Sequence, residues 1–365
     1  MKLFGGSISS RRSGGTKMPQ LMNFFNKKWV RVITIIMAVM GTGIISGVAW
    51  WNHNIVPPEI PGLDIPDAVE LPAFDINRTP RPADTEHVPF TPHSQRKPGV
   101  FTFIFLGKEN DGNTDTIMAG MLDTVNKTFN IVSIPRDTMV NVNRNIKKIN
   151  AAYGLGELTG KGNGILQLKG EIETLIGFIP DFYAIVNYRG FTRLVDTMGG
   201  VNFNVPANMY KVTDDMIIDL QRGQQKLNGN QALQLVRYRD YTGREGYGHD
   251  DYGRMAVQQE FLKAMGRQAI SLGNLFKLGE FMRIAEENLI TDLSGTSMTW
   301  LATTVMGYGT ECLSFHTLPT ESKRYNRGWY EHVLEEEALE MINRTINPYT
   351  RDITLEDLDI IKLSN

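Results

Sequence analysis

The feature that most constrains this chain of 365 residues is a run of twenty residues without a charge, from position 32 to position 51. It reads VITIIMAVMGTGIISGVAWW. Twenty apolar residues at about 1.5 Å per residue span the roughly 30 Å hydrocarbon core of a bilayer. Tryptophans stand at both ends, at Trp29, Trp50 and Trp51, where indole rings favour the headgroup region. The run therefore predicts a transmembrane helix over residues 32–51.

The charges around this run predict its orientation. Residues 1–31 contain seven Lys and Arg and no Asp or Glu, and since the whole chain is −2, the rest carries −9. Basic flanks stay in the cytoplasm, so we expect a basic cytoplasmic tail, a single pass through the cell membrane and an extracytoplasmic C-terminal domain. Two alternatives fit less well. A cleaved signal peptide has a shorter apolar core and a small-residue cleavage site, and a buried core helix lacks a one-sided basic flank.

Prolines dominate the segment that follows. Ten of the sixteen prolines fall within residues 52–98, which show almost no apolar periodicity. Such a segment predicts an extended, semi-rigid extracytoplasmic stalk. A pro-segment or a disordered tail is the alternative. A nucleic-acid partner is not expected, because the basic residues are concentrated beside the membrane and the body is acidic.

Residues 99–350 have the pattern of a folded α/β domain. Strands are expected over 100–107, 116–122, 129–134, 182–187, 234–238 and near 313–318. Helices are expected over 155–176 and 254–272, with further helices up to residue 350. Strands that alternate with helices predict an α-β-α layered domain with a central mixed β-sheet. Residues 351–365 are expected to form a C-terminal tail.

The first polar cluster is the loop between the first two predicted strands, with carboxylates at Glu109, Asp111 and Asp115. Mg²⁺ takes one or two carboxylates together with phosphate oxygens, so this loop is a candidate metal site. A merely solvated acidic loop is the alternative.

Two further clusters follow the strand 129–134. Arg136 and Asp137 come directly after it, and an arginine at a strand end can clamp a phosphate with two hydrogen bonds. An ion pair between Arg136 and Asp137 is the alternative. Lys148 adds a positive charge, and Asn150 is a plausible helix N-cap.

The fourth cluster is the richest in arginine. Arg237 and Arg239 stand two residues apart at the end of a predicted strand, and alternate strand residues point to the same face. Asp251 is a predicted N-cap, which places Arg254 in the first helical turn and Gln258 one turn later. Arginines at a helix N-terminus favour pyrophosphate. The alternative is surface arginines paired with nearby acidic residues, namely Asp240, Asp250 and Asp251.

These clusters, in this order, resemble the LytR–CpsA–Psr family of envelope transferases over roughly residues 98–350. The anchor and stalk fit the same layout, and six blocks in the correct order are hard to obtain by chance. The matching blocks are LG…TDTIM (106–118), VSIPRDTMV (132–140), KINAAY (148–153), YAIVNYRGFTRLVDTMGGVNFNVP (183–206), LNGNQALQLVRYRD (227–240) and DYGRMAVQQEFL (251–262).

The resemblance implies a phosphotransferase that moves a glycopolymer from a polyprenyl-pyrophosphate carrier onto peptidoglycan and leaves a phosphodiester link. The implied partners are that carrier-linked glycopolymer, peptidoglycan and the membrane lipid bilayer, and the implied cofactor is Mg²⁺ or Mn²⁺. Asp115 and Glu109 would bind the metal, and Asp115 or Asp137 would accept the proton of the attacking hydroxyl. The residues that would hold the pyrophosphate or support it are Arg136, Arg237, Arg239, Arg254, Gln258 and Lys148.

Two positions depart from the family pattern. Glu109 stands where the family usually has Asp, so the metal is expected to shift. Asn113 stands where the family usually has Arg, so one phosphate contact is expected to be lost. Two alternatives from other functional classes therefore remain: a phosphohydrolase that uses water as acceptor, and a non-catalytic lipid-binding regulator of the envelope.

The resemblance also implies a long apolar tunnel for the lipid, built from the 183–206 block and the helix after Arg254. Tyr183 and Phe191 are candidate lining residues that would bind the substrate. Ordinary core packing is the alternative for each candidate. The other candidates are Ile185, Leu194, Val195, Phe261 and Leu262.

Overall fold

The computed structural model describes five stretches of the chain, namely residues 55–61, 95–108, 114–239, 250–269 and 277–362. The predicted cytoplasmic tail, the predicted transmembrane helix and most of the predicted stalk lie outside them, so these remain predictions. None of the helices in the described stretches is long and apolar enough to cross a membrane. The elements below belong to the unit from Pro57 to Asn365.

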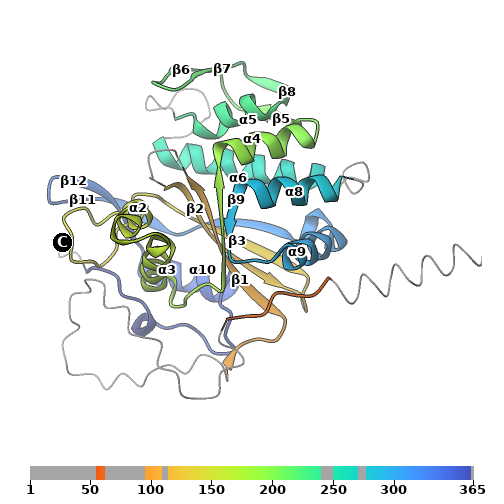
Figure 1. The fold of residues 1–365 in the computed structure, drawn as a ribbon. Helices are drawn as coiled ribbons and strands as arrows, with labels where there is room; N and C mark the ends of the chain where they lie inside the picture. Colours follow the sequence, from red (N-terminus) through yellow and green to blue (C-terminus); the bar gives the residue numbers. More distant parts are fainter. Residues whose placement is uncertain (1–54, 62–94, 109–113, 240–249, 270–276, 363–365) are drawn as a thin grey trace, which may run out of the picture. The chain divides into compact units, whose positions relative to one another are not determined.

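A central sheet of six strands lies between the helices (Figure 1). The strands are β1 (Val100–Lys108), β2 (Thr114–Asp123), β3 (Thr128–Ile134), β4 (Phe182–Asn187), β9 (Leu289–Thr291) and β10 (Leu313–Thr317). Their order across the sheet is β10-β3-β2-β1-β4-β9. β1 pairs with β4 and β3 with β10 in parallel, whereas β1 with β2, β2 with β3 and β4 with β9 are antiparallel. The predicted mixed sheet is therefore confirmed.

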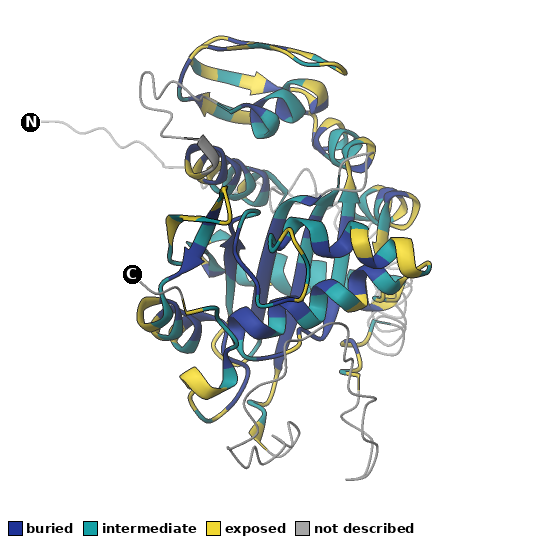
Figure 2. Cartoon of the chain, turned by 90° about the vertical axis from the view of Figure 1, so that its left-hand side faces the viewer, coloured by how far each residue is buried: buried dark blue, intermediate teal, exposed yellow. Residues whose placement is uncertain are grey.

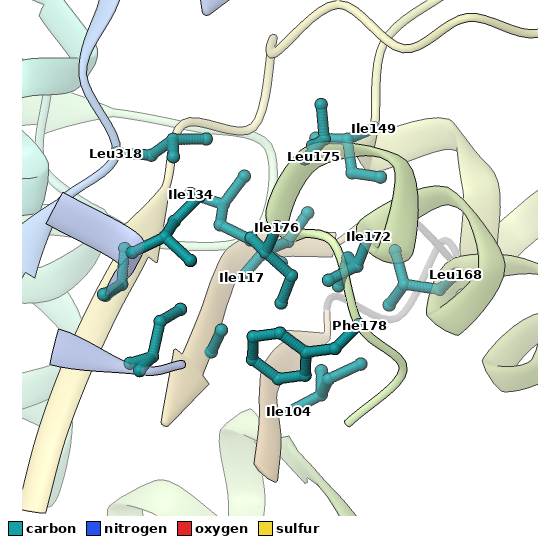
Figure 3. Packing of buried hydrophobic residues seen from close by; sticks show 14 of the residues in the cluster. Ile104, Ile117, Ile134, Ile149, Leu168, Ile172, Leu175, Ile176, Phe178 and Leu318 are labelled. Carbon is teal, nitrogen blue, oxygen red and sulfur yellow. The ribbon is translucent and has the colours of Figure 1, made fainter. Parts of the chain in front are cut away.

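One face of this sheet packs against aliphatic side chains, which form what we refer to as the first core. Ile104, Ile117 and Ile134 point to this face from three neighbouring strands and are fully buried. Figure 3 shows them together with Leu168 and Ile172, which come from a helix on this side. The helices that cover this face are α2 (Asn150–Thr159), α3 (Asn163–Ile176) and α10 (Glu335–Thr345).

The opposite face is lined by aromatic rings. Phe101 and Phe103 pack here, and Phe101 meets Trp300 edge-on at 5.4 Å between ring centroids. Gln259 reaches the same face and donates to Ser133 Oγ at 3.0 Å. Figure 2 shows buried residues, in dark blue, along the strands and on the inward sides of helices. Helices thus cover both faces, as predicted; those on this side are α6 (Asp250–Ala269) and α9 (Gly295–Tyr308).

A second core lies beyond the end of β4. Asn187 ends β4 and caps the next helix by accepting a hydrogen bond from Gly190 N. Val195, Leu235 and Phe261 are fully buried in this second core, so it draws side chains from three helices, including α6. Its other elements gather at the top of Figure 1: α4 (Tyr188–Thr197), β5 (Val201–Val205), β6 (Met209–Val212), β7 (Ile217–Leu220), β8 (Gly223–Leu227), α5 (Gly229–Arg237) and α8 (Leu278–Asn288).

A hairpin near the C-terminus docks on the loop that follows β3. Its strands are β11 (Thr320–Tyr325) and β12 (Gly328–Val333), and its two turn residues, Asn326 and Arg327, both have positive φ. That backbone suits the right-handed twist of a two-residue hairpin. Glu331 N donates to Asp137 O at 3.0 Å, which joins the hairpin to the loop. Two short 3-10 helices complete the described elements: η3 (Thr310–Cys312) and η4 (Leu355–Asp357).

The prediction of a strand over 234–238 was wrong, because these residues lie in or directly after helix α5. A capping box starts that helix: the Asn228 side chain accepts from Gln231 N, and the Gln231 side chain accepts from Asn228 N. Ala232 and Leu235, three residues apart, turn one side of the helix into the second core. The sequence analysis interpreted this short apolar run with the alternation of a strand, whereas its residues follow the spacing of a helix.

Other element boundaries also differ from the predictions. The helix predicted over 155–176 is two helices, α2 and α3, because the chain turns at a glycine pair in which Gly162 has φ 87°. The helix predicted to follow Asp251 starts at Asp250, so Asp251 lies inside it instead of capping it. Asn150 is likewise the first residue of α2 rather than its N-cap. Strands β5 to β9 and the β11–β12 hairpin were not predicted.

The segment predicted as a C-terminal tail packs on the first core as far as the structure describes it. Ile353 and Leu358 are buried members of that core. Asp359 N donates to Thr174 O at 2.8 Å, which fixes the segment to α3. Residues 351–362 therefore contribute to the stability of the domain.

We expect Ile353→Ala to lower the free energy of unfolding by about 2–4 kcal/mol, because it removes a fully buried side chain and leaves a cavity. Leu355→Ala in the same segment is the control, since Leu355 is exposed and its loss should cost less than about 0.5 kcal/mol. Denaturant unfolding of the full chain measures both values. Equal stability of the two variants would show that this segment does not pack as described.

Candidate active site

Asp115 and Arg136 meet at one end of the central sheet. β2 and β3 run antiparallel with Ile117 opposite Ile134, so the start of β2 lies beside the end of β3. Asp115 is the second residue of β2, and Arg136 is the second residue after β3. Arg136 Nη1 donates to Asp115 Oδ1 at 2.9 Å. Strand register thus joins two residues that the sequence analysis placed in separate clusters.

Helix α6 adds Arg254 and Gln258 to the same place. Arg254 Nη2 donates to the Asp115 backbone carbonyl at 3.3 Å, and its Nη1 lies 3.9 Å from Asp115 Oδ1. Gln258, one turn later, donates to Val236 O at 2.9 Å and accepts from Thr116 Oγ1 at 3.5 Å. Arg254 is only 2% exposed, and a cation buried to that extent needs nearby anions and acceptors. The predicted pairing of Arg254 with Gln258 on one side of the helix is confirmed.

Arg239 completes what we refer to as the arginine cluster: Arg136, Arg239 and Arg254 around Asp115. Arg239 Nη2 lies 3.9 Å from Asp115 Oδ1. Three guanidinium groups and the Asp115 carboxylate thus meet in one partly buried site. Partial burial weakens solvent screening, and guanidinium groups hold phosphate oxygens in pairs. The structure thus brings together three of the arginines predicted to hold a pyrophosphate, and that role stays a prediction.

Asp137 and Lys148 form an ion pair beside the cluster. Lys148 Nζ lies 2.8 Å from Asp137 Oδ2, and Arg136 Nε lies 3.7 Å from Asp137 Oδ1. The loop between β3 and α2 closes through a bridge between Met139 and Lys148, which explains why residues eleven positions apart meet. The ion pair of Arg136 with Asp137, given as the alternative, is thus present, whereas the phosphate-binding role of Arg136 stays a prediction.

Arg237 makes different contacts. It is the last residue of α5, and its guanidinium donates to both Asp215 oxygens at 2.7 and 3.2 Å. The same guanidinium lies 4.7 Å from the Tyr188 ring centroid. Hydrogen bonding to Arg237 lowers the pKa of Asp215. The argument that Arg237 and Arg239 share one face of a strand was wrong, because no strand forms here; a pyrophosphate role for Arg237 stays a prediction.

The candidate tunnel residues divide between the two cores. Phe191, Val195 and Phe261 belong to the second core, with Phe191 and Phe261 rings 6.1 Å apart. Tyr183 belongs to the first core and pairs with Ile104, four residues before the end of β1, so it lies roughly 13 Å along the sheet from that end. Burial raises the pKa of Tyr183, and the nearby charge of Asp292 raises it further. Among the other candidates, Ile185 is in the first core, and Leu194 and Leu262 contact the second.

The donor set in the described residues fits a metal only in combination with a ligand. No group of three His, Cys, Asp or Glu side chains comes together in the described stretches. Asp115 is the carboxylate at the arginine cluster, and one carboxylate plus phosphate oxygens is a donor set that Mg²⁺ accepts. Glu109, Asp111 and Asn113 lie outside the described residues, so the predicted metal role of Glu109 stays a prediction.

Two residues at the edge of this site were not predicted. Tyr252 OH hydrogen-bonds Glu331 and Thr320, which joins α6 to the β11–β12 hairpin. Tyr252 stands in the block 251–262 but carries no charge to mark it, and Glu331 stands in a strand that the sequence analysis did not find. Only the fold brings them beside Asp137.

Comparison with known proteins points to one family. A model of the LytR_cpsA_psr family matches residues 78–347, well over half of the chain. The chain is similar to TagU of Oceanobacillus iheyensis, which is named polyisoprenyl-teichoic acid–peptidoglycan teichoic acid transferase. The two sequences are 28% identical over 242 aligned residues, and the alignment covers 66% of this chain and 72% of TagU.

Two further relatives bear on fold and function. TagV of Bacillus subtilis, which carries the same transferase name, is 30% identical over 215 residues, 54% of this chain and 51% of TagV. Its crystal structure superposes with a TM-score of 0.55 at 26% identity, over 67% of this chain and 95% of the crystallised chain. The regulatory protein MsrR of Staphylococcus aureus is 28% identical over 221 residues, 57% of this chain and 62% of MsrR. The matched part thus spans about half the length of TagV.

We expect Arg136→Gln and Arg254→Gln each to weaken binding of inorganic pyrophosphate by at least about tenfold, because each removes charge-assisted hydrogen bonds. Titration calorimetry on the full chain measures the Kd. Arg193→Gln is the matched control, since Arg193 pairs with Glu287 between α4 and α8. Wild-type affinity in both cluster variants would contradict an anion site here. Arg136 is more exposed than Arg254, so the Arg136 variant still tests the site if loss of the buried Arg254 disturbs folding.

Proposed function

Because the chain belongs to the LytR–CpsA–Psr family, we propose that it is a phosphotransferase that moves a glycopolymer from a polyprenyl-pyrophosphate carrier onto peptidoglycan during cell wall biogenesis. The arginine cluster around Asp115 carries this proposal. Three guanidinium groups from three parts of the fold face one carboxylate, with Arg136 Nη1 2.9 Å away and the other two 3.9 Å away. Guanidinium groups hold phosphate oxygens in pairs, so three of them at one point suit a pyrophosphate.

The relatives support the same reaction class. TagU and TagV are named as transferases that move polyisoprenyl-linked teichoic acid to peptidoglycan. A donor of that kind has an anionic pyrophosphate between a lipid and a sugar. An anionic glycopolymer of the teichoic-acid type is therefore the donor class that we propose for this chain.

In the proposed reaction, a sugar hydroxyl of peptidoglycan attacks the phosphorus that bears the glycopolymer. A new P–O bond forms to the hydroxyl oxygen, the bond to the bridging oxygen breaks, and polyprenyl phosphate leaves with the electron pair. The product is a phosphodiester. Phosphoryl transfer depends mainly on positioning and on neutralising charge on the phosphate and leaving-group oxygens.

The cluster residues supply that positioning. Arg254 is fixed by the Asp115 carbonyl and by burial, so its guanidinium needs little reorganisation when an anion arrives. Arg136 is more exposed and lies between two carboxylates, Asp115 and Asp137. In this proposal either carboxylate would accept the proton of the attacking hydroxyl, and Lys148 Nζ beside Asp137 adds positive charge at this edge.

Mg²⁺ or Mn²⁺ completes the proposed site. When bound, the metal would neutralise phosphate charge and fix the two phosphate groups relative to each other. Asp115 and Glu109 are the proposed ligands from this chain. Glutamate is one methylene longer than the aspartate usual in the family, so the ion would lie further from the backbone of Glu109 than from that of an aspartate.

The proposed location is the outer face of the cell membrane. A polyprenyl carrier stays in the bilayer, so a transferase gains from an anchor in the same membrane. The uncharged run 32–51 and its basic flank support a single-pass anchor with the domain outside. The proline-rich residues 52–98 would then set how far the site reaches from the bilayer.

A regulatory role is the second candidate, favoured by one observation. MsrR, which is 28% identical over 221 residues, is named a regulatory protein. The departures Glu109 and Asn113 fall in the loop that should hold metal and phosphate. Turnover of a lipid-linked glycan separates the candidates, and an assay with and without peptidoglycan separates transfer from hydrolysis.

We expect Arg136→Ala and Arg254→Ala to slow release of polyprenyl phosphate from a lipid-linked glycan by about 100-fold or more. Each removes a guanidinium group that would hydrogen-bond the phosphate oxygens as negative charge develops in the transition state. The assay uses the full chain in detergent with peptidoglycan present. Arg193→Ala should keep the wild-type rate, because it pairs with Glu287 away from the cluster. Wild-type turnover by both cluster variants would refute the assignment of the site.

Metal dependence gives a separate expectation. Chelation with EDTA should abolish transfer, and added Mg²⁺ or Mn²⁺ should restore it. Asp115→Asn keeps the size of the side chain but loses the charge, so it should lower the rate by about 100-fold and raise the metal concentration needed for half-maximal rate. Full activity in EDTA would remove the metal from the proposal but leave the arginine cluster in place.

A further inference from the structure

A groove with a volume of about 440 Å³ opens beside α6. Tyr252, Met255 and Gln259 line it from positions i, i+3 and i+7 of the helix, which share one side. Arg254 and Gln258 point from a different side of the same helix toward β2. One helix thus separates two surfaces of different character. The opposite wall runs from Thr317, the last residue of β10, through Pro319 to Thr320, the first residue of β11.

The chemistry of the groove differs from that of the arginine cluster. Its lining side chains carry no formal charge: they are apolar groups interrupted by hydroxyl and amide groups. The arginine cluster, in contrast, gathers three guanidinium groups around Asp115. A pyrophosphate belongs in the cluster on electrostatic grounds, whereas the groove suits an uncharged ligand with both apolar faces and hydroxyl groups. A sugar ring has that combination.

Thr320, which lines the groove, is also the first residue of β11 in the β11–β12 hairpin. Ser322 lies opposite Glu331, and Arg324 opposite Trp329, so these four residues and Thr320 point to one face, which we refer to as the outward face. Val333, opposite Thr320 on this face, is buried in the first core, so the exposed part of the face lies toward Trp329. Trp329 is 64% exposed, an unusual state for so large an aromatic side chain. From Thr320 to Arg324 the strip extends roughly 13 Å, at about 3.3 Å per residue.

The other face of the hairpin is turned toward the catalytic loop. Tyr330 is buried, and its ring centroid lies 5.5 Å from Lys148 Nζ. Glu331 N donates to Asp137 O at 3.0 Å, and Tyr252 OH hydrogen-bonds the Glu331 carboxylate. The outward face therefore starts within one residue of Arg136 and ends at Trp329. A ligand along it would therefore lie beside the loop that carries Arg136 and Asp137.

We propose that the groove and the outward face of the hairpin, together the acceptor strip, bind the glycan strand of peptidoglycan. The proposal rests on the proposed function, because a transferase must hold its acceptor beside the anionic donor. Tyr252 at one end and Trp329 at the other offer rings on which the C–H faces of amino sugars can pack. The hydroxyl groups of Thr320 and Ser322 both donate to the Glu331 carboxylate, and this hydrogen-bonded group is the polar part of the strip.

Binding without donor tests this inference. The full chain in detergent is mixed with insoluble peptidoglycan freed of attached polymers, and the bound fraction is measured by co-sedimentation. We expect Trp329→Ala to weaken binding by at least about tenfold, whereas Trp329→Phe, which keeps a ring, should retain most of it. Tyr210→Ala is the matched control, because Tyr210 is 70% exposed on the β6–β7 hairpin.

A second readout separates this inference from the proposed function. In the transfer assay, Trp329→Ala should raise the KM for soluble uncrosslinked glycan strands about tenfold and leave the affinity for inorganic pyrophosphate unchanged. Wild-type glycan affinity in Trp329→Ala, or equal losses in Trp329→Ala and Tyr210→Ala, would overturn the acceptor strip. If pyrophosphate binding and turnover fail in the wild type while glycan binding still depends on Trp329, the transferase proposal falls and the glycan surface stands.

Discussion

The carboxylate of Asp115 is the point on which the described site depends. Three guanidinium groups repel one another, and a shared anion offsets that repulsion. Asp115 provides it, with its carboxylate facing Arg136, Arg239 and Arg254 and its backbone carbonyl accepting from Arg254. The three arginines come from the loop after β3, the segment after α5 and helix α6. The sheet and the second core are therefore tied together at this residue.

Helix α6 explains how one element serves several purposes. Phe261 anchors it in the second core, and Gln259 fixes it to the sheet through Ser133. Between these anchors, Arg254 is held against β2 and Tyr252 reaches the β11–β12 hairpin. A helix held at this many points keeps its functional groups in place without help from a ligand, which is what electrostatic stabilisation requires.

Charge divides the surface around α6 into two regions. On one side the arginine cluster concentrates positive charge, and on the other the groove is lined by uncharged side chains. A reaction that joins a charged donor to a hydroxyl-bearing acceptor needs both regions next to each other. The backbone bond between Glu331 and Asp137 sets the spacing between them.

The sequence by itself determined the α/β class, the mixed sheet, the family and most of the polar residues that meet at the site, because strand periodicity and motif order are local properties. It also supplied the predicted anchor, which lies outside the described residues.

Tertiary structure decided the rest. The strand assigned to 234–238 is a helix because a capping box and contacts with the second core outweigh a short apolar run. Arg237 consequently pairs with Asp215, while Arg239 faces Asp115. Glu331 and Trp329 lie near Asp137 only because the β11–β12 hairpin docks there. Contacts between residues almost two hundred positions apart leave no periodic signal in the sequence.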